Sequence, residues 1–274
     1  IGTLNFFGDV GKVVFPAAMG MLVVAVGWRW SFAVQGALGV VMSLCYLIFF
    51  RHQIVARLRH IPRAKQDSNT QSRARRRSLR DHLAGWGIRK PRQFALYTTI
   101  GFVDVAVRTA ATAFLGFILI DNGVEDAALG WLMSLTFLGG AAGKLLCGMV
   151  VDRWSSRFTI LVTEVLMILG CFALPSVPVG WPMLFFLPLF GFVLNGTSSV
   201  IYIGLAPTFT REQRSRGYAL YYTTNFFSVA LAPFAFGLVG DSFGLDSIFF
   251  GAGLIMAISM PLVLFVRDEA HRTT

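Results

Sequence analysis

The chain has 274 residues, of which 55% are hydrophobic and only 14% are charged, and this balance excludes a soluble globular protein. The formal charge of +10 does not indicate a nucleic-acid partner, because residues 51–92 hold 13 Lys/Arg against Asp67 and Asp81. The rest of the chain is nearly neutral. The composition therefore predicts an all-α polytopic membrane protein that binds no nucleic acid.

Hydropathy divides the sequence into eight spans, each near the ~20 residues that cross a hydrocarbon core. The predicted spans are 1–26, 30–50, 94–120, 129–151, 158–175, 183–206, 217–240 and 248–266. Loops on one side, together with the tail from Arg267, carry 20 of the 24 Lys/Arg, whereas the opposite loops carry only Arg29. By the positive-inside rule both ends are cytosolic, in a plasma or bacterial inner membrane.

The first span combines two charges with a pattern of small residues. Asp9 and Lys12 are three residues apart inside an apolar run, so they are candidates for a substrate or proton pathway. A second pattern consists of Gly2, Gly11, Pro16 and Gly20, which we interpret as a helix-packing motif. Small residues permit close helix approach and proline kinks a helix.

That pattern resembles the antiporter motif in the fifth helix of the major facilitator superfamily, with Phe15 and Met19 in place of two glycines. We expect the motif to seal against small residues in span 129–151, namely Gly139, Gly140 and Gly143. The turn from Gly27 to Phe32 also resembles the family's outer connection between helices five and six.

An internal repeat is visible when residue n is compared with residue n+217. The matching pairs are Pro16/Pro233, Gly20/Gly237, Gly27/Gly244, Phe32/Phe249 and Gly36/Gly253. Spans one and two then correspond to spans seven and eight. The resemblance implies helices five to twelve of a twelve-helix fold, with the first four missing.

Three regions follow from this organisation: 1–50, the last two helices of an N-terminal bundle; 51–93, a basic cytosolic loop; and 94–274, a C-terminal six-helix bundle with a short tail. The basic loop is expected to lie on anionic lipid headgroups, which contribute about 1 kcal/mol per charge. A regulatory partner that docks on it is the alternative.

Asp104 and Arg108 lie in the middle of span 94–120, four residues apart and therefore on one face. One interpretation is that they line a central cavity, where Asp104 exchanges a proton and Arg108 binds an anionic substrate or pairs with the aspartate until substrate intervenes. The other is a static ion pair. The resemblance places this helix against the cavity and favours the first.

The segment from Gly148 to Arg157 resembles the loop signature between helices eight and nine of the family, through Gly148, Asp152, Arg153 and Arg157. Ser155 and Ser156 replace a glycine and a basic residue of that signature. The resemblance implies a cytosolic gate, to which we also assign two charges inside the adjoining spans, Lys144 and Glu164, because they lie at a similar depth and could pair.

Four further polar residues are candidates for the substrate or proton pathway. Asn195 is near the midpoint of span 183–206, which the resemblance makes the cavity-lining tenth helix. Tyr221, Tyr222 and Asn225 lie near the start of span 217–240. Packing and interfacial roles are the alternatives for all four.

Taken together, the resemblances cover most of the chain and imply a secondary transporter with a small-molecule substrate, coupled to protons or another ion through alternating access. The first span favours proton-coupled efflux. Alternatives are coupled uptake of an organic anion, and a non-transporting membrane scaffold or sensor. The sequence contains no arrangement typical of an enzyme, a metal site or a cofactor site, and we expect a monomer.

Overall fold

A computed structural model describes residues 2–59 and 86–266, with side chains at 8–49, 86–151 and 153–266. The helices are α1 (Gly2–Arg59), α3 (Pro91–Asp121), α4 (Asp126–Arg153), α5 (Ser156–Ala173), α6 (Trp181–Leu205), α7 (Arg214–Phe243) and α8 (Leu245–Ser259). Short 3₁₀ helices follow α5, α6 and α8 at Leu174–Ser176, Ala206–Thr208 and Met260–Phe265. The described residues contain no strand, so the all-α prediction is confirmed.

Seven stretches of the described residues are long and apolar enough to cross a membrane, which makes the chain a multi-pass integral membrane protein. One of them, Gly8–Phe49, has 42 residues, about twice the length that a single crossing needs. The helical geometry of α1 breaks inside it at Gly27, where φ is 80° and ψ is 161°. The break divides α1 at the turn predicted between the first two spans, so the eight predicted spans are accounted for.

The same backbone geometry recurs at the position that the internal repeat assigns to Gly27. Gly244 joins α7 to α8 with φ 89° and ψ 165°. This conformation is open to glycine because it has no Cβ. A proline inside the helix precedes each turn glycine by eleven residues. It is Pro16 in α1 and Pro233 in α7. Two hairpins far apart in sequence therefore share one backbone design.

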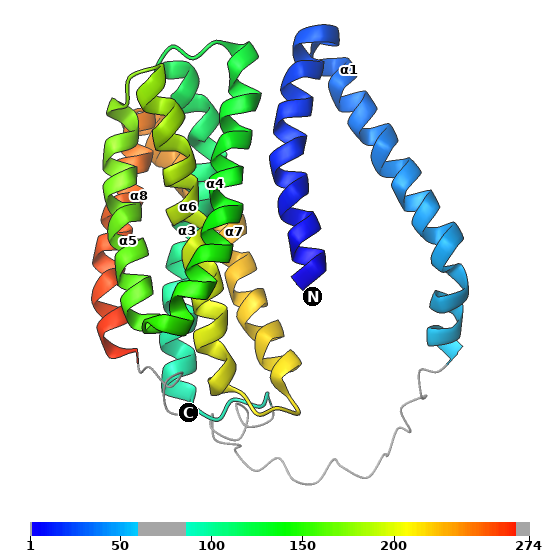
Figure 1. The fold of residues 1–274 in the computed structure, drawn as a ribbon, viewed down its shortest axis with the longest axis vertical. Coiled ribbons are helices and arrows are strands. Elements are labelled where there is room, and N and C mark those ends of the chain that lie inside the picture. The colour runs from blue at the N-terminus through cyan, green and yellow to red at the C-terminus, as the bar shows by residue number, and fades with distance from the viewer. Residues whose placement is uncertain (1, 60–85, 267–274) are drawn as a thin grey trace. The chain divides into compact units, whose positions relative to one another are not determined.

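The chain groups into two units, residues 1–20 with 79–274 and residues 21–78. In the first unit α4 packs most extensively on α6, α3 packs on α7 and α8, and α5 packs on α6 and α8. Figure 1 shows α3 to α8 gathered into one bundle. The core of that bundle is apolar and holds fully buried residues such as Leu115, Met167 and Phe249.

Glycines explain how α4 and α6 come so close. A Cβ at Gly139 would overlap the carbonyl of Pro188, and one at Gly143 would overlap the carbonyl of Phe192. Gly140 is covered by the side chain of Asn195. The expectation that these three glycines receive the first span is therefore wrong, because they receive α6.

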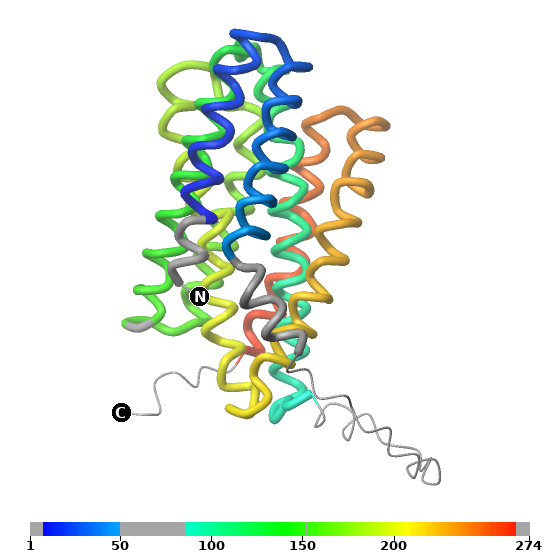
Figure 2. The backbone as a smooth tube through the Cα atoms, turned by 90° about the vertical axis from the view of Figure 1, so that its right-hand side faces the viewer, coloured from blue at the N-terminus to red at the C-terminus, as the bar shows by residue number. Residues whose placement is uncertain are grey.

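The first span instead meets a different glycine of α4. A Cβ built on Gly130 would lie 2.6 Å from the carbonyl oxygen of Pro16 and 2.9 Å from the Cα of Gly20. Residues 8–20 run beside α4 in both views (Figures 1 and 2). Pro16 and Gly20 thus perform the close-packing role expected of the motif. Gly11 has no atom within 4 Å of an added Cβ, and the side-chain surroundings of position 2 lie outside the described residues.

Candidate functional site

A cavity of about 880 Å³ opens among the helices of the first unit. Its lining comes from five helices: Gly8, Asp9 and Lys12 of α1, Arg108 of α3, Lys144 of α4, Asn195, Ser198, Ser199 and Tyr202 of α6, and Tyr222 of α7. Several of these side chains were predicted to face substrate. The structure brings together charges that are up to 135 residues apart in the chain.

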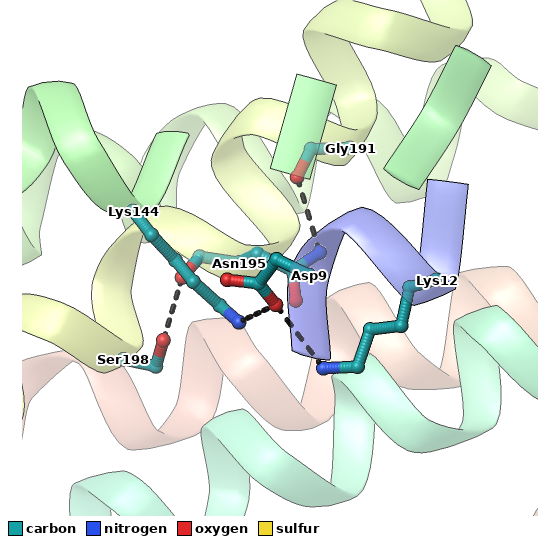
Figure 3. A network of polar contacts seen from close by, with 6 residues as sticks. All are labelled: Asp9, Lys12, Lys144, Gly191, Asn195 and Ser198. Carbon is teal, nitrogen blue, oxygen red and sulfur yellow. Dashed lines mark hydrogen bonds and ion pairs between the residues drawn. The ribbon is translucent and has the colours of Figure 1, made fainter. Parts of the chain in front are cut away.

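A three-charge cluster formed by Asp9, Lys12 and Lys144 lies at the α1 side of this cavity. The Lys144 Nζ donates to Asp9 Oδ1 at 2.6 Å, and Lys12 Nζ lies 3.4 Å from the same oxygen. Figure 3 shows the Asp9 carboxylate between the two ammonium groups. The suggested pairing of Lys144 with Glu164 is therefore wrong: Lys144 projects into the cavity and pairs with Asp9.

Four polar side chains of α6 form one wall. Asn195, Ser198, Ser199 and Tyr202 are spaced i, i+3, i+4 and i+7, which puts them on one helical face. The Asn195 amide donates to the Gly191 carbonyl at 3.3 Å, and the Ser198 hydroxyl donates to the Asn195 carbonyl at 2.7 Å (Figure 3). Sequence reasoning missed Tyr202, although its seven-residue offset from Asn195 was a usable signal.

Arg108 reaches the cavity from α3, and Asp104 lies behind it. Arg108 is 19% exposed, whereas the Asp104 side chain is 1% exposed, and Nη1 of Arg108 is 3.9 Å from Oδ2 of Asp104. That distance allows an ion pair but no direct hydrogen bond. Neither carboxylate oxygen has a hydrogen-bond partner among the described residues. The expectation that both residues line the cavity holds for Arg108 only.

Of the three candidate residues in α7, one lines the cavity and two are buried behind it. Tyr222 lines the cavity, but Tyr221 is 2% exposed and Asn225 is 6% exposed. The hydroxyl of Tyr221 lies against α3, where a Cβ at Gly101 would be 2.5 Å from it. Tyr221 and Asn225 therefore contribute to the packed layer beneath the cavity, not to its surface.

A second, apolar cavity of about 620 Å³ adjoins the charged one. It shares Asp9, Lys144 and Ser199 with the charged cavity. The rest of its lining is aliphatic and consists of Val10, Val13, Val14, Leu138, Ala141, Ala142 and Leu145. A charged region and an apolar region thus meet at one ion pair.

The predicted gate lies at the turn between α4 and α5. α4 ends at Arg153 and α5 begins at Ser156, so the turn contains only Trp154 and Ser155. The Ser155 hydroxyl accepts a hydrogen bond from the Phe158 amide at 3.1 Å and caps α5. The serine therefore allows a tight turn where the family signature has glycine. The side chain of Asp152 lies outside the described residues, so its gate role, with that of Gly148, Arg153 and Arg157, stays a prediction.

The charges that line the cavity are three cations, Lys12, Arg108 and Lys144, and one carboxylate, Asp9. Asp104 behind Arg108 balances part of this charge, and the excess that remains suits an anion. A guanidinium and two ammonium groups supply the donors that carboxylate, sulfonate or phosphate groups require.

Comparison with known proteins supports the architecture. Residues 97–274 match the model of the Major Facilitator Superfamily. This chain belongs to that superfamily. A D-xylose-proton symporter-like 2 protein of Arabidopsis thaliana is 26% identical over 186 residues, which cover 66% of this chain and 33% of the relative. The chain thus aligns with about a third of that relative.

Proposed function

We propose that this protein is a secondary active transporter that couples the movement of a small organic anion to protons by alternating access. The observation that carries the proposal is the cavity between these helices, which is lined by three cations and one carboxylate. Membership of the superfamily supports secondary transport, and the symporter in the relative's name supports proton coupling. The adjoining aliphatic cavity suits the apolar part of such an anion.

The pair Asp104–Arg108 supplies a coupling device. While Arg108 faces Asp104, the guanidinium stabilises the ionised carboxylate. When the head group of an anion takes the guanidinium, Asp104 loses the cation that balances its charge. A proton that enters from the cavity as Arg108 moves away then neutralises the buried charge. Anion and proton therefore bind together, which is the linkage required for symport.

Proton-coupled efflux by antiport is the second candidate, and one observation favours it. The antiporter-like pattern of the first span packs closely on α4, although on another glycine than expected, since Pro16 and Gly20 meet Gly130 backbone to backbone. The two candidates differ in the sign of the linkage. Symport requires that proton and solute favour each other's binding, whereas antiport requires that they compete.

The test uses benzenesulfonate, whose permanent charge prevents leakage as a neutral acid, in proteoliposomes with an imposed pH gradient. Neutral benzenesulfonamide and cationic benzyltrimethylammonium are the matched probes. We expect accumulation of the sulfonate alone, driven by an acidic outside for symport and by an acidic lumen for antiport. Equal accumulation of the three probes would refute the proposal. Sulfonate accumulation that does not depend on the pH gradient would also refute it.

A further inference from the structure

The charged cavity and the aliphatic cavity have three lining residues in common, Asp9, Lys144 and Ser199. The remaining seven residues around the aliphatic cavity are valine, leucine and alanine, whose side chains carry no hydrogen-bond donor or acceptor. A ligand bound at Lys144 therefore has a polar surface on one side and an aliphatic surface on the other.

The aliphatic cavity is an elongated groove between α1 and α4, which touch backbone to backbone at Gly130. On α1 its lining runs from Val14 to Asp9, and on α4 it runs from Leu138 to Leu145. Along both helices the lining thus lies between the backbone contact and the ion pair. Seven residues of α-helix rise about 10 Å, which gives the length of the α4 wall.

Small side chains leave this groove unfilled. Ala141 and Ala142 line it between the larger Leu138 and Leu145. Val14 is 57% exposed and Leu145 is 62% exposed, so the groove is open along its side and not enclosed. A flexible chain can enter such a groove without any rearrangement of the helices.

The chemistry of the lining selects among the groups that could fill it. A polyhydroxy group would leave its hydroxyls without partners along the aliphatic walls, at a cost for each of them. A saturated chain has no such cost, and each methylene group that leaves water contributes to binding. The Lys144 ammonium has three N–H donors, of which Asp9 accepts one, so it can bind a head group while the ion pair persists.

We propose that the groove binds the unbranched alkyl chain of an anion whose head group lies at Lys144. The ligand class is then a linear alkyl monoanion, such as an alkyl carboxylate or sulfonate, and not a polyhydroxy solute. The inference rests on the proposed function for the anionic head group, and it adds the nature of the chain attached to that head group.

The test is equilibrium binding of n-alkanesulfonates, from ethyl to octyl, to the purified protein in nanodiscs, with binding to empty nanodiscs subtracted. We expect affinity to rise about fourfold with each added methylene group, which corresponds to ~0.8 kcal/mol, until the chain fills the groove. Lys144→Gln should lower the affinity of every member of the series by a similar factor, because it changes the head-group site and not the groove.

Variants of the groove should have the opposite pattern. Ala142→Leu fills the groove, so it should remove most of the gain with chain length while ethanesulfonate affinity is retained. Val14→Thr, which places a hydroxyl in the wall, should reduce the gain per methylene group. Ala127→Leu, at an exposed position of α4 outside both cavities, is the matched control and should behave as the wild type.

An affinity that does not depend on chain length in the wild type would overturn the inference. An unchanged gain in both Ala142→Leu and Val14→Thr would also overturn it, because the chain would then bind elsewhere. So would n-alkanols that bind as tightly as sulfonates of the same length, since the chain would not need Lys144. Failure of pH-driven benzenesulfonate transport would contradict the proposed function but none of these results, because binding requires no gradient.

Discussion

Two aspartates of one bundle experience opposite environments. Asp9 lies in the cavity wall, 18% exposed, with a lysine ammonium at 2.6 Å and a second at 3.4 Å. Asp104 is 1% exposed and has only a guanidinium at 3.9 Å, beyond hydrogen-bond distance. The Asp9 carboxylate is part of an ion-pair network with two ammonium groups, whereas the buried Asp104 has one distant cation to balance it. Under the proposed function, electrostatic binding belongs to the Asp9 region and proton exchange to the Asp104 region.

Substitution of Asp104 should have the largest effect on transport. We expect Asp104→Asn to reduce pH-driven accumulation of benzenesulfonate by about 100-fold, which corresponds to ~2.7 kcal/mol of coupling, because the amide cannot release a proton. Binding of the sulfonate should survive, since Arg108 remains. Accumulation ratios in proteoliposomes and affinity in detergent separate the two effects. Uphill transport with wild-type pH dependence in Asp104→Asn would reduce the pair to a structural role.

Lys144→Gln tests the binding side. Loss of a charge-assisted interaction of ~1.5–3 kcal/mol should weaken benzenesulfonate affinity by about tenfold or more, while the pH dependence of transport persists. Arg211→Gln, which removes an exposed cation outside the cavity, is the matched control. Equal losses in both variants would mean that the cavity cations exert only a general surface effect.

Gly130→Ala should disturb the packing of α1 on α4 that places Asp9 beside Lys144. The added methyl group would lie 2.6 Å from the Pro16 carbonyl, and such overpacking costs about 1–3 kcal/mol. The thermal unfolding temperature in detergent and the sulfonate affinity should both decline. At Gly116 a Cβ meets only Leu129 at 3.9 Å, so Gly116→Ala should be neutral. Wild-type stability in Gly130→Ala would contradict the close contact.

Tyr202→Phe is expected to have the smallest effect. Removal of one wall hydroxyl, with a typical net contribution of ~0.5–1.5 kcal/mol, should weaken sulfonate affinity by about threefold. Tyr221→Phe, at a tyrosine buried outside the cavity lining, should leave affinity unchanged. Titration of both variants checks this difference. A larger loss in Tyr221→Phe would mean that the binding surface lies beneath the α6 wall of the cavity.

Hydropathy and glycine position were sufficient to predict the architecture. The eight spans follow from the length of each apolar run, and the turn at Gly27 was predicted from the residues around it. The correspondence of Gly27 with Gly244 came from sequence alone, and the shared backbone angles now support it. Length and backbone preference are local properties, so the sequence reports them directly.

Side-chain partners across helices were less predictable. In a helix that is apolar on every side, depth can be counted from the ends, but the direction that a residue faces depends on its neighbours. Lys144 and Glu164 were expected to pair because they lie at a similar depth. In the structure Lys144 of α4 lines the cavity, whereas Glu164 of α5 is fully buried. The buried face of α5 does carry a signal, since Ser156, Thr159 and Thr163 share it with Glu164.

The single guanidinium opposite Asp104 also has an electrical consequence. If each monovalent anion that engages Arg108 is accompanied by one proton on Asp104, the loaded site has the same net charge as the empty one. Moving one uncompensated charge through 100 mV involves about 2.3 kcal/mol, but an electroneutral pair experiences no such force. Transport would then depend on the pH gradient but not on the membrane potential. A potassium diffusion potential set with valinomycin should therefore leave the transport rate unchanged.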